Sequence, residues 1–144
     1  MAIDIRPPSE PEGLPRSVLA EDGAVRGQGP EVATADLVDL YRRMRLARRF
    51  DRALADLLRQ GRIGFHLPGE GEEAVSAATA YALRASDWLF PAFRDLPAFL
   101  VRGVPLETLA HQAFGSAASP TLGRPLPLYF ADRERRIATP GAGG

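Results

Sequence analysis

The sequence contains no cysteine, no lysine and no asparagine among its 144 residues, and only two histidines. Without cysteine the chain has no disulfide, thiol nucleophile or thiolate metal site, and without lysine it has no Schiff-base lysine and no lysine of a phosphate-binding P-loop. His66 and His111 are too few for a histidine-rich metal site. Several classes of enzyme are therefore excluded, and arginine is left as the only strong cation.

The charges of the chain balance, with 18 cations, all arginine, and 18 carboxylates. A net charge of zero argues against a protein that binds nucleic acid or membrane surfaces through bulk charge. No apolar run approaches the roughly 20 residues that cross a bilayer, and no signal sequence stands at the amino terminus. We expect a cytoplasmic protein without a nucleic-acid or membrane partner.

Prolines and glycines are concentrated in the first 33 residues, which disfavours long helices there. We expect residues 1–33 to form an extended arm and residues 34–144 to form the folded part of the chain. Within the arm, Arg16–Gly23 is predicted to be a short strand that ends in an Asp-Gly turn. A leader without fixed structure is the alternative.

A long helix is predicted from Thr34, which can cap it, to Gly61, which ends it. Its length of about 40 Å is more than so small a domain needs to cover itself. Six arginines lie on its other face: Arg42, Arg43, Arg45, Arg48, Arg49 and Arg52. Either this face is solvated, with Arg48 and Arg52 paired to Asp51 and Asp56, or it docks another subunit.

A glycine-rich loop follows Gly61 and contains His66. His66 could act as an acid, a base or a phosphate donor, or it could be a packed structural residue. The next helix is expected to extend to Leu83. Glu72 and Glu73 fall in its first turn, where they either complement the helix dipole or form a catalytic pair.

Arg94 is the strong charge in the stretch from Asp87 to Gly103. Trp88-Leu-Phe90 before it is predicted to be a buried strand or an extended segment, and a helix is expected after Pro97. A guanidinium at this point can bind a phosphate or a carboxylate through two parallel hydrogen bonds. We therefore expect a ligand beside Arg94.

The remaining chain is predicted to contain three further elements. The first is a helix over Leu106–Phe114, opened by Pro105 and closed by Gly115. The second is an extended segment over residues 123–130, whose alternating prolines do not suit a central strand. The third is a charged turn over residues 132–136.

Six motifs resemble, in order, the amino-terminal part of the alpha subunit of thiamine-diphosphate-dependent 2-oxo acid dehydrogenases. They are Leu40-Tyr-Arg-Arg-Met-Arg-Leu-Ala-Arg-Arg-Phe-Asp51, Arg59-Gln-Gly-Arg62, Gly71-Glu-Glu-Ala74, Phe90-Pro-Ala-Phe-Arg-Asp95, Arg102-Gly-Val-Pro-Leu106 and Gly123-Arg124. Three features, Arg59-Gln-Gly-Arg62, Gly71-Glu-Glu-Ala74 and the Gly-Arg-x-x-Pro run that begins at Gly123, are more similar to the branched-chain type than to the pyruvate type. The resemblance implies a chain that is mainly helical, as the amino-terminal portion of an α/β thiamine-diphosphate-binding fold, truncated before the magnesium-binding core.

The same resemblance implies oxidative decarboxylation of a 2-oxo acid, with transfer of the acyl group to a lipoyl group. The implied partners are a beta subunit, which supplies the catalytic glutamate in a heterotetramer, and a lipoyl-bearing acyltransferase. Cofactor-binding roles fall on Phe93, Arg94 and Thr139, and no catalytic residue falls on this chain. Phe93 replaces the tyrosine of the family and loses one hydrogen bond to the diphosphate.

Magnesium is implied as well, but its Gly-Asp-Gly motif and later asparagine are absent from the sequence. We expect the chain to be a fragment, the first third of an alpha subunit, that is inactive alone. One alternative is a non-catalytic helical module that binds a beta-type partner through the arginine-rich helix. Another is an unrelated helical domain that binds an acidic small molecule at Arg94 and Arg124.

Overall fold

The computed structural model describes residues 22–24 and 31–139, and the chain divides into two units, residues 1–33 and 34–144. In the first unit, the amide of Ala24 donates a hydrogen bond of 2.9 Å to Asp22 Oδ1, and Gly23 has a φ of +81°. Residues 22–24 therefore form a turn, as the Asp-Gly pair predicts. The strand expected before it lies outside the described residues.

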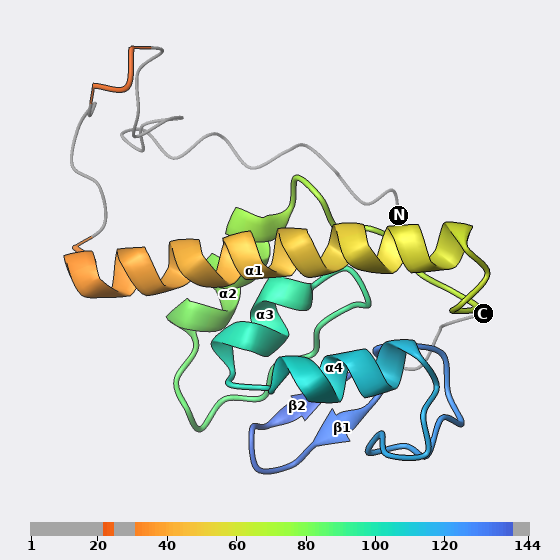
Figure 1. The fold of residues 1–144 in the computed structure, drawn as a ribbon. Helices are drawn as coiled ribbons and strands as arrows, with labels where there is room; N and C mark the ends of the chain where they lie inside the picture. Colours follow the sequence, from red (N-terminus) through yellow and green to blue (C-terminus); the bar gives the residue numbers. More distant parts are fainter. Residues whose placement is uncertain (1–21, 25–30, 140–144) are drawn as a thin grey trace, which may run out of the picture. The chain divides into compact units, whose positions relative to one another are not determined.

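Helix α1, Thr34–Arg59, is the predicted long helix (Figure 1). Ala47, Asp51 and Leu54 are buried on one side, where their spacing of three and four places them together. The helix ends because Gly61 adopts a φ of +69°, which glycine tolerates. The amides of Gly61 and Arg62 then bond to the carbonyls of Leu58 and Leu57.

Three shorter helices follow: α2, Glu73–Ala82; α3, Leu96–Val101; and α4, Leu106–Ala113. Helices α1, α2 and α3 pack against one another (Figure 1). Ala77 and Ala80 are buried on α2, and their small side chains permit its close approach to α3. The hydroxyl oxygen of Ser76 accepts a hydrogen bond from the amide of Ala98, which joins these two helices. The prediction of a mainly helical chain is confirmed.

Two short strands, β1 (Ala131–Asp132) and β2 (Ile137–Ala138), form an antiparallel hairpin around the predicted charged turn. Leu89 adds a parallel bridge to Ile137. Of the two alternatives predicted for Trp88-Leu-Phe90, the structure has the extended segment, and the predicted burial is wrong for two of its residues. Trp88 is 43% exposed and Phe90 65% exposed, because neighbouring side chains on extended backbone point to opposite sides.

The segment over residues 123–130 forms turns, so the prediction of an extended run is wrong. The amide of Tyr129 bonds to the carbonyl of Leu126, and Leu128 has a φ of +64°. This turn directs Leu128 and Phe130 into the core. Phe130 stacks on the fully buried Phe99, with 5.3 Å between ring centroids. In the described residues, no helix combines the length and the apolar character needed to cross a membrane.

Candidate functional site

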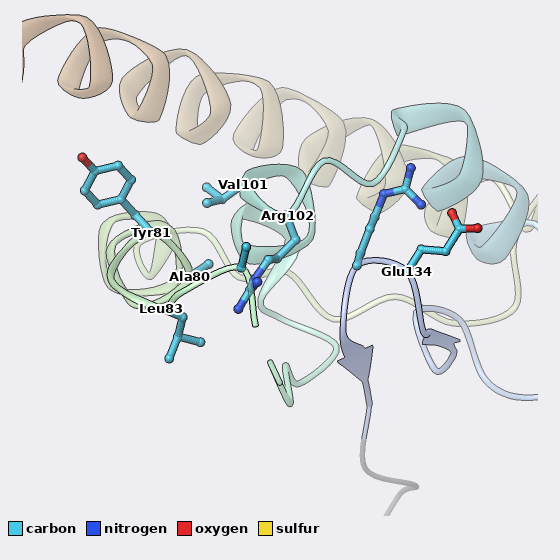
Figure 2. Close-up of a pocket in the computed structure, with 8 residues that line it drawn as sticks. Ala80, Tyr81, Leu83, Val101, Arg102 and Glu134 are labelled. Carbon is cyan, nitrogen blue, oxygen red and sulfur yellow. The ribbon is translucent and has the colours of Figure 1, made fainter. Parts of the chain in front are cut away.

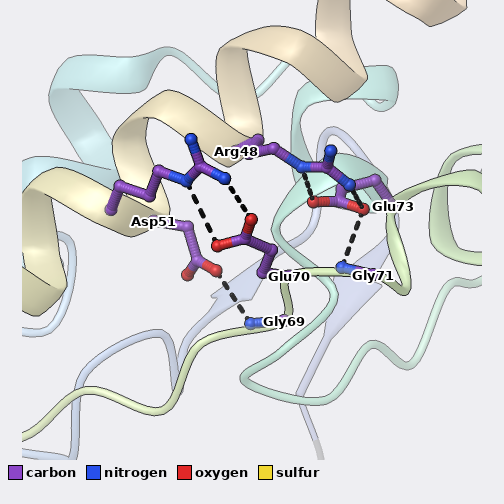
Figure 3. A network of polar contacts seen from close by, with 7 residues as sticks. Arg48, Asp51, Gly69, Glu70, Gly71 and Glu73 are labelled. Atoms are coloured by element: carbon purple, nitrogen blue, oxygen red, sulfur yellow. Dashed lines mark hydrogen bonds and ion pairs between the residues drawn. The ribbon is translucent and has the colours of Figure 1, made fainter.

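Arg48 of α1 and Glu73 at the start of α2 form a two-pronged ion pair (Figure 3). Arg48 Nε and Nη2 each donate a 2.7 Å hydrogen bond to one oxygen of the carboxylate. Glu73 is buried, whereas the Arg48 side chain is 43% exposed. The hydrogen bonds from Arg48, and those from the amides of Glu73 and Gly71, lower the pKa of Glu73 to about 2. Glu73 is therefore an anion that joins two helices.

Arg52 forms a second pair, one turn along α1, with Glu70 of the glycine-rich loop (Figure 3). The hydrogen bond from Arg52 lowers the pKa of Glu70, and the same bond raises that of Arg52. Pairing of Arg48 and Arg52 with Asp51 and Asp56 within the helix, one of the two interpretations of this face, is wrong. The carboxylates come instead from the loop and from α2.

Asp51 is a buried carboxylate between α1 and the same loop. Its Oδ2 accepts a 2.9 Å hydrogen bond from the amide of Gly69 (Figure 3). Its Oδ1 lies 2.9 Å from Nε2 of the buried His66, although the direction of the contact does not make a hydrogen bond. Asp51 thus fixes the position of the loop at Gly69.

Gly69 in turn packs against the backbone of Arg94, the residue for which a ligand is expected. A Cβ atom at position 69 would overlap the carbonyl oxygen of Arg94 and lie 3.3 Å from its carbonyl carbon. Because side chains never come so close to backbone, glycine is required here. A chain of contacts therefore runs from Asp51 through Gly69 to Arg94.

The Arg94 side chain is exposed at the edge of a small pocket that Asp51, Gly69 and Glu73 also line. Its guanidinium carbon lies 5.7 Å from the ring centroid of Phe93, which orients the side chain by a cation–π contact. The ion pairs of the described residues involve other arginines: Arg43, Arg48, Arg52, Arg59 and Arg135. The backbone of Arg94 is thus held by Gly69 and its side chain is oriented by Phe93, while its N–H groups are available to donate to an anion.

Phe93 is half-buried in an aromatic cluster. Its ring centroid lies 6.1 Å from that of Phe65 and 6.1 Å from that of Tyr129. His66 lines a small void beside the cluster, in contact with apolar residues. The structure therefore places His66 in the packed interior, as one of its two interpretations expects.

Thr139, the third predicted cofactor residue, does not line the pocket beside Arg94. Its hydroxyl donates a 3.1 Å hydrogen bond to the carbonyl of Phe130, which also accepts the amide of Thr139. The structure brings Phe93 and Arg94 together and leaves Thr139 in a separate backbone contact. Its predicted role in cofactor binding stays a prediction.

A hollow of about 400 Å³ lies between α2, the end of α3 and the hairpin turn (Figure 2). Its two arginines are already engaged. Arg102 donates to the carbonyls of Arg84 and Asp87, and Arg135 donates to Asp132 and to the carbonyl of Gly103. This hollow therefore offers no free cation, whereas Arg94 has no ion-pair partner among the described residues and also lies beside the contact with Gly69.

A metal site is absent from the part of the chain that the structure describes, where no three histidine, aspartate or glutamate side chains gather. The residues present thus do not fit a magnesium ion. Sequence reasoning also missed Asp51 and Gly69 as residues that support Arg94. The glycine content of the loop was the one available signal, and it did not indicate which glycine makes the contact.

Comparison with known proteins connects this geometry to one family. A family profile described as dehydrogenase E1 component matches residues 41–142. Among curated proteins, the mitochondrial 2-oxoisovalerate dehydrogenase subunit alpha of Mus musculus is 31% identical over 112 residues, which cover 78% of this chain and 25% of the relative. The 2-oxoisovalerate dehydrogenase subunit alpha of Bacillus subtilis is 35% identical over 116 residues, 79% of this chain and 35% of the relative.

A pyruvate dehydrogenase E1 component subunit alpha of Staphylococcus epidermidis is 40% identical over 91 residues, 62% of this chain and 25% of the relative. The chain therefore spans about a quarter to a third of the length of these curated relatives. Relatives named for two different 2-oxo acids match it.

Proposed function

Because the chain belongs to the dehydrogenase E1 component family, we propose that it serves as the amino-terminal part of the alpha subunit of a thiamine-diphosphate-dependent 2-oxo acid dehydrogenase. Arg94 is the residue proposed to bind the diphosphate. The observation that carries this proposal is the exposed guanidinium of Arg94, which lies within cation–π distance of Phe93 and is free of the ion pairs that engage other arginines of the described chain. A planar guanidinium matches the geometry of phosphate oxygens.

The residues fit one part of the cofactor and not another. Arg94 fits the diphosphate, and its backbone is fixed by the contact with Gly69. The described residues do not fit the magnesium ion, and the sequence has no Gly-Asp-Gly motif. When bound, thiamine diphosphate supplies the carbanion chemistry that decarboxylates a 2-oxo acid. The role proposed for this chain is to bind and orient the diphosphate end.

We further propose that the chain works with a beta subunit and a lipoyl-bearing acyltransferase in the cytoplasm, as part of an α/β thiamine-diphosphate-binding fold. By itself it is not expected to decarboxylate a 2-oxo acid, because the resemblance assigns the activating glutamate to the beta subunit. A branched-chain 2-oxo acid is the proposed substrate. This substrate is supported by the amino-acid sequences of two motifs, Arg59-Gln-Gly-Arg62 and Gly71-Glu-Glu-Ala74, and by the relatives named for 2-oxoisovalerate.

A chimera tests the proposal. This chain would replace the matching part of the Bacillus subtilis 2-oxoisovalerate dehydrogenase subunit alpha, and the chimera would be co-expressed with its beta subunit. We expect decarboxylation of 2-oxoisovalerate in preference to pyruvate. Arg94→Gln should reduce kcat/KM by about 10- to 100-fold, the cost of a lost bond to a charged group, whereas Arg133→Gln should not. A chimera that assembles but does not bind thiamine diphosphate would overturn the proposal.

A further inference from the structure

The outer face of α1 carries a row of three exposed arginines, Arg42, Arg45 and Arg49, here called the arginine row. Their spacing of three and four residues places them along one side of the helix. Ala47 and Leu54 are buried on the opposite side. The row therefore faces away from the rest of its own unit.

All the carboxylates of α1 are engaged elsewhere. The hydroxyl of Tyr81 donates to Asp36, Arg43 pairs with Asp39, the amide of Gly69 donates to Asp51, and Arg59 pairs with Asp56. The other arginines of the helix have carboxylate partners of their own. The arginine row has none among the described residues, and its three like charges repel one another.

Exposed apolar side chains flank the arginine row. Val38 is 42% exposed, Tyr41 57% and Leu46 41%. Arg45 donates a 3.2 Å hydrogen bond to the Tyr41 hydroxyl, and its guanidinium lies 5.8 Å from the Tyr41 ring centroid. Arginine and tyrosine carry much of the binding energy at protein interfaces, and a side chain already held in place loses less entropy on binding.

We propose that this face of α1 binds an acidic amphipathic helix of a partner protein. Arg42 and Arg49 are about 10 Å apart along the axis, two helical turns, so carboxylates two turns apart on a partner helix match them. Apolar residues of that helix would cover Val38 and Leu46. A second copy of this face is disfavoured because it would bring the same three positive charges together.

The inference is independent of the proposed function, because the arginine row and Arg94 lie on different elements. Loss of one site should leave the other intact. Binding of pyrophosphate at Arg94 and binding of an acidic helix at α1 can therefore be measured separately. A chain that does not bind pyrophosphate can still bind the acidic helix, and the reverse also holds.

The test uses the full 144-residue chain and a fluorescent peptide of about 18 residues, five helical turns, with glutamates two turns apart and leucines between them. A peptide with lysine in place of each glutamate is the control. Fluorescence anisotropy reports binding of the peptide. The measurement is made at about 0.15 M salt, because at that ionic strength charges more than about 8 Å apart are largely screened. We expect the glutamate peptide to bind and the lysine peptide not to bind.

Replacing the arginine row by glutamine (R42Q, R45Q and R49Q together) should weaken binding about tenfold or more. A matched triple variant, R84Q, R133Q and R136Q, removes the same charge elsewhere and should change affinity less than twofold. Replacing the row by glutamate should transfer binding to the lysine peptide. Circular dichroism of each variant reports whether α1 stays folded. Binding of the lysine peptide by the arginine-to-glutamate variant is a gain of function, so loss of stability in a variant does not explain it.

Three results would overturn the inference. The first is equal loss of affinity in the matched triple variant. The second is a chain that ignores the glutamate peptide but binds phosphatidylserine vesicles through the arginine row. The third is self-association in sedimentation experiments that the arginine-to-glutamine variant abolishes, since that result would make the occupant a second copy.

Discussion

The backbones of Gly69 and Arg94 touch, so closely that a Cβ atom at position 69 would overlap the Arg94 carbonyl oxygen. The two residues are far apart on the chain and belong to different loops. Because Asp51 holds the amide of Gly69, the contact links α1 to the residue proposed to bind the diphosphate. The shape of the site thus depends on the absence of one side chain.

Gly69→Ala should therefore displace Arg94. We expect a loss of about 1–3 kcal/mol in the free energy of unfolding, the usual cost of forcing extra atoms into a packed contact. Affinity for pyrophosphate should fall as well. The matched control is Gly64→Ala, since a Cβ there meets nothing within 4 Å. Urea denaturation and calorimetry of both variants check this, and equal behaviour of the two would contradict it.

Asp51→Ala removes the acceptor of the Gly69 amide. The partly buried N–H then loses its hydrogen bond to a charged acceptor, so we expect a loss of about 1–3 kcal/mol in the free energy of unfolding. Pyrophosphate affinity should fall in the same variant, because the loop no longer supports Arg94. Asp56→Ala removes an exposed pair with Arg59 and should cost less than about 1 kcal/mol. If both variants lose the same stability, Asp51 does not have the role described.

The pair between Arg48 and Glu73 predicts a pH dependence of stability. Its bonds lower the pKa of Glu73 from 4.5 to about 2 in the folded chain. The contribution is complete above pH 4.5 and is lost as the pH falls toward 2, where the carboxylate becomes protonated in the folded state.

Glu73→Gln should remove this acid-sensitive part of the stability. At pH 7 we expect a loss of about 1–2 kcal/mol, less than for a fully buried pair because Arg48 remains partly exposed to solvent. Thermal unfolding between pH 7 and pH 2 measures the difference. Parallel curves for wild type and variant across this range would show that Glu73 does not titrate as described.

Phe93→Tyr should strengthen binding of thiamine diphosphate. The resemblance places a tyrosine at this position, and the ring lies beside Arg94, so a hydroxyl can add one hydrogen bond to a phosphate oxygen. We expect affinity to rise about 3- to 10-fold. Phe114→Tyr adds a hydroxyl at an exposed position elsewhere and should have no effect. Calorimetry distinguishes them, and no gain for Phe93→Tyr would remove Phe93 from the site.

Local signals in the sequence predicted the helices well. The spacing of apolar residues between Thr34 and Gly61 defines α1, and Gly61 ends it through a φ that other residues avoid. Glu73–Ala82 and Leu106–Ala113 match their predictions to within about one residue. These signals are contained in a few neighbouring residues, so they do not depend on the rest of the fold.

Contacts between distant residues could not be predicted in the same way. Arg48 has Asp51 three residues away on its own helix, yet it pairs with Glu73, 25 residues away. Likewise, Leu89 alone of its apolar run is buried, because its partner Ile137 comes from the hairpin. The motif around Arg94 predicted that this residue binds a ligand. The supporting role of Asp51 and Gly69 could not be predicted, because it depends on contacts between residues that are far apart in the sequence.

Titration of the 144-residue chain with inorganic pyrophosphate tests the central claim most directly, because it probes Arg94 without the magnesium site. Isothermal calorimetry of wild type, Arg94→Gln, Arg94→Lys and Arg133→Gln compares the loss of the guanidinium, the loss of its planar fork and the loss of an unrelated charge. The account predicts binding by wild type and Arg133→Gln, intermediate affinity for Arg94→Lys and a loss of about tenfold or more for Arg94→Gln. Equal affinity of Arg94→Gln and wild type, or no binding by wild type, would contradict it.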